Sequence, residues 1–66
     1  MRRVFPNIEA ERERHGLTHA ALAERLGVSR DTLKNWLRGD AEIPASKVAE
    51  MARLFQCSSD YLLGLR

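Results

Sequence analysis

The segment 16–39 constrains the fold of this chain more than any other part of it. It reads GLTHAALAERLGVSRDTLKNWLRG, in which only residues 27–29 separate two short helical patterns. Thr18 and Ser29 each precede one pattern and are predicted N-caps, because a hydroxyl oxygen can accept a hydrogen bond from a backbone amide that is otherwise unpaired in the first helical turn. Two helices joined by so short a turn containing glycine are expected to cross steeply rather than to lie antiparallel.

The second pattern has an apolar side and a polar side. In a helix that begins near residue 30, the i, i+3, i+4 spacing places Leu33, Trp36 and Leu37 together. Its other side carries polar residues of the types that read base edges in DNA, where arginine suits guanine, asparagine suits adenine and a carboxylate suits cytosine. Most charged helix faces are merely solvated. The preceding helix and turn, in the order of a helix-turn-helix, favour DNA binding.

The segment LTHAALAERLGVSRDTLKNWLRG resembles the helix-turn-helix of the Cro and lambda-repressor-type transcriptional regulators, whose pattern is close to LTQ..LA..LGVS..T(I/L).N(W/Y)E.G. The matching positions are Leu17, Thr18, Leu22, Ala23, Leu26, Gly27, Val28, Ser29, Thr32, Leu33, Asn35, Trp36 and Gly39. Residues 58–64 (SSDYLLG) resemble the last short helix of the same family. The resemblance implies an all-α, compact five-helix DNA-binding domain over residues 1–66, with its helix-turn-helix at about 18–38.

A recognition helix of about residues 30–38 is expected to enter the major groove of an operator. The expected base contacts come from Arg30, Asp31, Lys34 and Asn35. The expected phosphate contacts come from Thr18, His19 and Arg38, helped by the N-terminus of the preceding helix. Asp31 has two alternative roles, because it could instead orient Arg30 or repel phosphate at wrong registers.

Two positions depart from the family pattern. His19 stands where the family has a glutamine that contacts phosphate, and histidine donates less reliably near neutral pH. Leu37 replaces a glutamate that, in the family, pairs with an arginine of the first helix, here Arg12. Arg12 therefore needs another partner, and Glu9 is available three residues earlier on the same face.

Composition supports these expectations only weakly. With 66 residues the chain is near the lower limit for folding without disulfides or metals, and its single cysteine, Cys57, cannot form an internal disulfide. A reducing cytoplasm is the simplest location, and no apolar stretch approaches the roughly 18 residues of a membrane span. Eleven basic residues face nine acidic ones, for a net charge of +2, so DNA binding depends on where the charges lie.

The rest of the chain is predicted to be scaffold. A first helix opens at Pro6 and Asn7, with Ile8 in the core and Val4 and Phe5 packed nearby. Its charge run EAERER predicts the pairs Glu9–Arg12 and Glu11–Arg14. Ser46 is the predicted cap of a fourth helix and Ser58 that of a fifth. The fourth helix has a core stripe at Val48, Met51, Ala52 and Phe55.

The residue inventory disfavours an enzyme, a cofactor or a metal site. His15 and His19 are four apart, but Gly16 and the Thr18 cap lie between them, so they are expected on different elements. Cys57 is expected to pack as a small hydrophobe rather than act as a nucleophile. No small-molecule substrate is indicated.

The predicted function is a sequence-specific transcriptional regulator, most simply a repressor that occupies an operator. Because one small domain reads few base pairs, a homodimer on two half-sites is expected, with the segment containing Leu63 and Leu65 as a candidate interface. Leu63 could equally complete the core, and Leu65 could be a frayed end. The alternative function is a protein-interaction module or antitoxin-like adaptor on the same fold.

Overall fold

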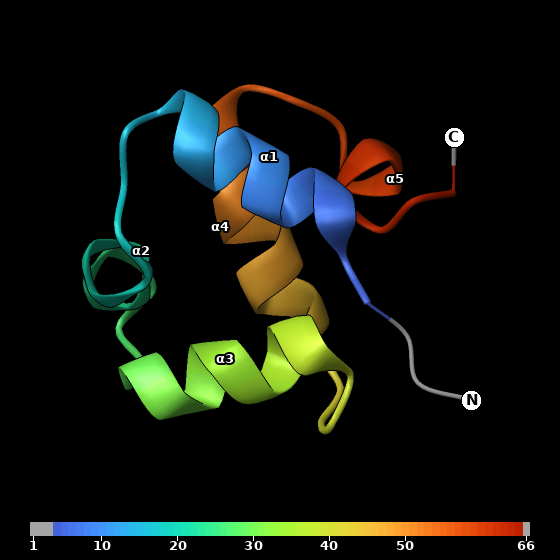
Figure 1. The fold of residues 1–66 in the computed structure, drawn as a ribbon. Helices are drawn as coiled ribbons and strands as arrows, with labels where there is room; N and C mark the ends of the chain where they lie inside the picture. Colours follow the sequence, from blue (N-terminus) through green and yellow to red (C-terminus); the bar gives the residue numbers. More distant parts are fainter. Residues whose placement is uncertain (1–3, 66) are drawn as a thin grey trace.

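Helices account for all the regular secondary structure in the computed structural model, which describes residues 4–65. They are α1 (Pro6–Arg14), α2 (His19–Leu26), α3 (Arg30–Arg38), α4 (Ala45–Phe55) and α5 (Ser59–Leu62). The predicted all-α class with five helices is therefore confirmed over this range. In Figure 1, α2 is seen along its axis while α3 lies across the view, so these two helices cross steeply.

Three of the four predicted N-caps are confirmed. The hydroxyl of Thr18 accepts the amide of Ala21 at 3.0 Å, and that of Ser29 accepts the amide of Thr32 at 3.1 Å. The hydroxyl of Ser58 caps α5 in the same way.

The fourth predicted cap, Ser46, is wrong. Helix α4 begins two residues earlier than a cap at Ser46 implies: its first residue is Ala45, Pro44 stands at the cap position, and no side chain caps the helix. The carbonyl of Pro44 accepts the amides of Lys47 and Val48 at 2.9 and 3.1 Å. The backbone carbonyl of Pro44 thus accepts the first hydrogen bonds of the helix, and Ser46 lies inside the first turn.

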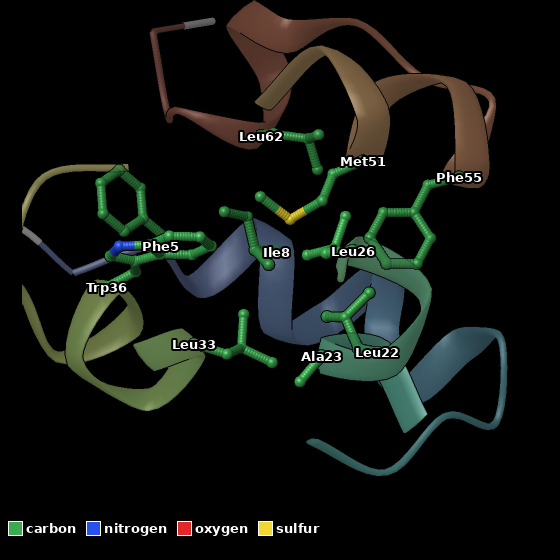
Figure 2. Close-up of a cluster of buried hydrophobic side chains, with 10 residues drawn as sticks. All are labelled: Phe5, Ile8, Leu22, Ala23, Leu26, Leu33, Trp36, Met51, Phe55 and Leu62. Atoms are coloured by element: carbon green, nitrogen blue, oxygen red, sulfur yellow. The ribbon is translucent and has the colours of Figure 1, made fainter. Parts of the chain in front are cut away.

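Each of the five helices contributes one completely buried side chain to a single core. These residues are Ile8, Leu22, Leu33, Met51 and Leu62, each 0% exposed. They converge between the helices with Phe5, Trp36 and Phe55 around them (Figure 2). The prediction that Val4 packs beside this core is wrong, because Val4 is 61% exposed while its neighbour Phe5 is buried. The chain turns inward only at Phe5.

Long-range hydrogen bonds from polar side chains join helices at their ends. The ammonium of Lys47 donates to the carbonyl of Leu26, the last residue of α2, at 2.7 Å. A cation suits the negative end of a helix dipole, so α4 stabilises the point where α2 stops. Asn7 similarly donates to the carbonyl of Tyr61 at 2.6 Å and joins α1 to α5.

We expect Ser29→Ala to lower the free energy of unfolding by about 1 kcal/mol, because it removes the cap of α3. Ser29 also donates to the hydroxyl of Thr32 at 2.9 Å, and that contact is lost with the cap. Urea denaturation measures the change. Ser46→Ala is the matched control, since the Ser46 hydroxyl caps no helix. Equal denaturation midpoints for the two variants would contradict the prediction.

Candidate nucleic-acid interface

The turn between α2 and α3 is built from backbone conformation and from one partly buried side chain. Gly27 adopts φ +71°, a left-handed conformation that a side chain would strain. The amide of Val28 then donates back to the carbonyl of Ala23 at 3.0 Å, while its side chain packs against the core. Ser29 follows directly as the next cap. Three residues thus end one helix and start the next, which fixes α3 across α2.

Helix α3 separates its apolar residues sharply from its polar ones. Leu33 and Trp36 are buried, with exposures of 0% and 6%, and Leu37 is half-buried against the same core. The predicted base-contact residues lie on the outer side of the helix, where Asn35 is half-buried and the other three are exposed: Arg30, Asp31 and Lys34. Within residues 4–65 these three side chains make no hydrogen bond or ion pair with any other residue. They are available to a ligand.

Asn35, the fourth predicted base contact, is held at the C-terminal end of α3. Its carbonyl oxygen Oδ1 accepts from Nη2 of Arg38 at 2.6 Å. Nε of Arg38 donates in turn to Oδ2 of Asp40 at 3.2 Å. The structure therefore brings together a residue predicted to read bases and one predicted to contact phosphate.

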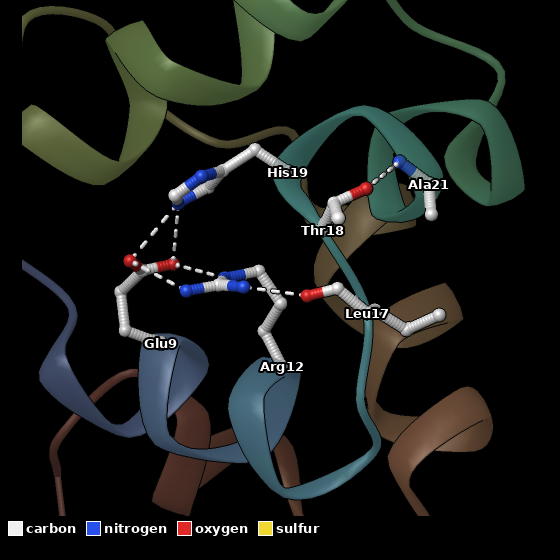
Figure 3. Close-up of polar contacts among 6 residues, drawn as sticks. All are labelled: Glu9, Arg12, Leu17, Thr18, His19 and Ala21. Carbon is white, nitrogen blue, oxygen red and sulfur yellow. Dashed lines mark hydrogen bonds and ion pairs between the residues drawn. The ribbon is translucent and has the colours of Figure 1, made fainter.

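The other two predicted phosphate contacts lie at the start of α2. The Thr18 oxygen accepts as a cap, so its hydroxyl hydrogen remains to donate. The ring atom Nε2 of His19 instead lies against the Glu9 carboxylate, 3.1 and 3.0 Å from its two oxygens (Figure 3).

Glu9 links two helices through one carboxylate. The predicted Glu9–Arg12 pair is confirmed at 3.0 Å, and Arg12 also donates to the carbonyl of Leu17 at 2.5 Å. Sequence reasoning missed the additional bond to His19, which joins α1 to α2 over ten residues. No helical periodicity relates residues on two different elements, so spacing along the chain held no signal for this contact.

The same partners change the acidity of Glu9. Partial burial alone would raise the pKa of this carboxyl group. The hydrogen bonds from Arg12 and His19, together with the positive charges of these residues, outweigh that effect and lower the pKa below its ordinary 4.5. The folded state therefore favours ionised Glu9.

We expect acid to weaken this link. Because the folded-state pKa of Glu9 lies below the unfolded value, its stabilising contribution is complete above about pH 4.5 and is lost as the pH falls through the folded-state value. Partial solvent exposure limits the contribution to about 1 kcal/mol or less. Thermal unfolding midpoints between pH 3 and pH 7 measure it, with Glu9→Gln expected to show a shallower pH dependence than wild type.

Glu24→Gln is the matched control, because the Glu24 side chain is exposed and makes no hydrogen bond or ion pair within the described part of the chain. This variant should keep the wild-type pH profile. Parallel profiles for wild type and Glu9→Gln would contradict the role given to Glu9.

Side chains from α1, α2 and α3 surround an open depression of about 270 Å³. Its lining residues are Glu9, His19, Lys34, Leu37 and Arg38. Leu37 makes part of this lining apolar at the position where the resembling family has a glutamate. The depression lies between the predicted phosphate contacts at the start of α2 and the outer face of α3, so the two parts of the predicted site form one surface.

Other chemistries find little support in the described residues. No group of three or more histidine, cysteine or acidic residues is placed to hold a metal ion within residues 4–65. Burial, with the nearby charge of Glu11, raises the pKa of the Cys57 thiol, opposite to the shift that activates a nucleophile. As predicted, Cys57 packs against the core. None of the helices in this range is both long enough and apolar enough to cross a membrane.

A helix, a three-residue turn and a second helix with an exposed polar face define a helix-turn-helix domain. The family model described as "Helix-turn-helix" matches residues 8–62, and the chain belongs to this family.

Comparison with curated proteins adds two relatives. The chain is 34% identical over 56 residues to the repressor protein C2 of Salmonella phage P22, a match that covers 85% of this chain and 26% of that protein. It is 35% identical over 54 residues to the uncharacterized HTH-type transcriptional regulator YobD of Bacillus subtilis (strain 168), covering 82% and 48%. The chain thus spans about a quarter and about half of the lengths of these two relatives.

One solved structure is similar to this chain in both fold and sequence. The P22 c2 repressor protein, crystallised with a synthetic operator in the presence of Tl⁺, superposes with a TM-score of 0.75 at 34% identity. The match covers 85% of each chain.

Proposed function

We propose that this chain binds double-stranded DNA sequence-specifically through α3 in the major groove and represses transcription by occupying an operator. The observation that carries the proposal is the outer face of α3, where the side chains of Arg30, Asp31 and Lys34 are exposed and make no hydrogen bond or ion pair within the described residues. The likeness to a phage repressor solved with its operator supports it. A reducing cytoplasm, where DNA is accessible and Cys57 stays a thiol, is the proposed location.

Each predicted site residue takes a definite part in this proposal. The outer face supplies the base contacts from Arg30, Asp31, Lys34 and Asn35. Thr18 donates its hydroxyl hydrogen to phosphate. His19 donates to phosphate from Nδ1 in its imidazolium form, because Nε2 is directed at Glu9 and only the imidazolium carries a hydrogen on both ring nitrogens. Arg38 uses the guanidinium N–H groups that are not engaged with Asn35 and Asp40.

A homodimer on two half-sites about 34 Å apart is the proposed binding form. Leu65 is 59% exposed after the last helix. Leu63, which packs partly against the core, lines a groove of about 400 Å³ with Phe5 and Ile43. An exposed leucine two residues after one that lines a partly apolar groove supports this end of the chain as the interface, in which each copy would cover the exposed leucine of the other.

The same face disfavours the protein-interaction alternative. Protein interfaces centre on aromatic or aliphatic anchors. The large apolar residues of α3 face the core: Leu33 and Trp36 are buried in the domain itself, and Leu37 is half-buried against the same core. The outer face therefore offers charge and hydrogen bonds in place of an anchor.

Selection from a randomised duplex pool at near-physiological salt tests the proposal. We expect enrichment of an inverted repeat with half-sites one helical turn apart, and lost discrimination at one position of each half-site for Asn35→Ala. Sedimentation with the selected duplex should give two chains per site, and Leu65→Asp should reduce this to one. Weak, salt-sensitive binding without any enriched sequence would contradict the proposed function.

A further inference from the structure

The Asn35 amide is oriented by a chain of contacts that starts where α3 ends. Gly39 adopts φ +79°, and the amide of Asp40 folds back to donate to the backbone carbonyl of Asn35 at 2.9 Å. This turn brings the Asp40 carboxylate beside Arg38, whose Nε donates to it at 3.2 Å. The guanidinium is thereby set to donate from Nη2 to Oδ1 of Asn35 at 2.6 Å.

An asparagine side chain carries one acceptor oxygen and one NH₂ group with two donors. With Oδ1 turned toward Arg38, the NH₂ group lies on the other side of the planar amide. A free asparagine can rotate to present either group to a base. Asn35 is held in one of these two orientations by the contact to Arg38.

We infer that Arg38 is a positioning residue that makes Asn35 a hydrogen-bond donor toward the major groove. The base opposite Asn35 must then offer an acceptor, which guanine, adenine and thymine do through N7, O6 or O4. Cytosine presents only its amino donor there and is rejected. This inference rests on the proposed function, because it concerns which base α3 selects once it lies in the groove.

Arg38 also has N–H groups left for a phosphate, and the two roles differ in what they predict. Loss of a phosphate contact weakens binding to all sequences about equally. Loss of positioning changes the ratio of affinities between duplexes that differ at a single base pair. The ratio therefore isolates the positioning role even though Arg38 performs both.

The matched pair Arg38→Gln and Arg38→Met separates these roles. Both variants lose the positive charge, but only glutamine keeps an N–H donor for Asn35. Binding is measured to four duplexes that differ at the base pair identified by Asn35→Ala. We expect wild type to disfavour cytosine by roughly tenfold, Arg38→Met to lose most of that ratio and Arg38→Gln to retain most of it. Thermal unfolding checks that both variants fold. Because the Arg38 side chain is 58% exposed, we expect both to keep the wild-type fold.

Asn35→Asp supplies the converse test. It keeps one oxygen for Arg38 and replaces the NH₂ group by a second acceptor, so we expect the preference to move toward cytosine. If Arg38→Met and Arg38→Gln weaken binding equally and leave the ratio of affinities among the four duplexes unchanged, this inference is overturned while the proposed function stands. Absence of any enriched motif for the wild-type chain would overturn the proposed function and this inference together.

Discussion

Trp36→Ala is expected to remove most of the folding stability of this domain. Trp36 is 6% exposed and lies beside Phe5, where α3 meets the segment that leads into α1 (Figure 2). Truncation of a buried tryptophan costs about 3–5 kcal/mol, and a core of this size rarely supplies more than about 3–5 kcal/mol in total. The variant should therefore be largely unfolded at 37 °C.

Far-UV circular dichroism during urea and thermal denaturation measures the loss, since Trp36 is the single tryptophan and fluorescence disappears with it. Lys34→Ala is the control on the same helix, because Lys34 lies on the exposed face. It should unfold at nearly the wild-type midpoint. A cooperative transition for Trp36→Ala within about 1 kcal/mol of wild type would show that this contact is dispensable.

The second large effect is expected on binding. The double variant Arg30→Ala/Lys34→Ala should lose at least about 30-fold in affinity for the selected operator, because each base contact is worth about 1–3 kcal/mol. The slope of log affinity against log salt should also become shallower, by up to about one for each cation that neutralises a phosphate. Neither side chain has a partner within residues 4–65, so folding should be unchanged.

Titration of a labelled operator duplex at several salt concentrations provides both quantities. Arg14→Ala/Arg53→Ala removes the same charge from the last turns of α1 and α4, which lie away from α3 in the view of Figure 1. This control should bind within a few-fold of wild type. Equal losses for the two double variants would mean that net charge, rather than the face of α3, determines binding.

Local signals made the helix-turn-helix predictable from the sequence. Thr18 and Ser29 each cap a helix by accepting a hydrogen bond from an amide three residues later, and Gly27 ends α2 by adopting a left-handed backbone conformation. The core stripes were equally readable, because helical periodicity assigns Leu33 and Trp36 to one side of α3. Which of the exposed residues touch DNA is still a prediction.

Contacts between distant segments were not predictable in the same way. The predicted Glu11–Arg14 pair is confirmed at 3.3 Å. Glu11 is also 5% exposed and accepts from the hydroxyl of Tyr61, fifty residues later, which spacing along the chain did not predict. The Lys47 bond to the carbonyl of Leu26 likewise depends on how α4 packs against α2. Ser46 was misassigned because a proline and a serine compete to start one helix, and the proline comes first.

The residues that hold α3 in the domain and those that face outward from it are different residues. Leu33 and Trp36 are packed inside the domain, whereas the side chains of Arg30, Asp31 and Lys34 make no hydrogen bond or ion pair within residues 4–65. We therefore expect the outer positions to tolerate exchange as a set while the fold is kept. A new operator preference could be grafted onto this scaffold, and natural variants could change their target sites while keeping the same core.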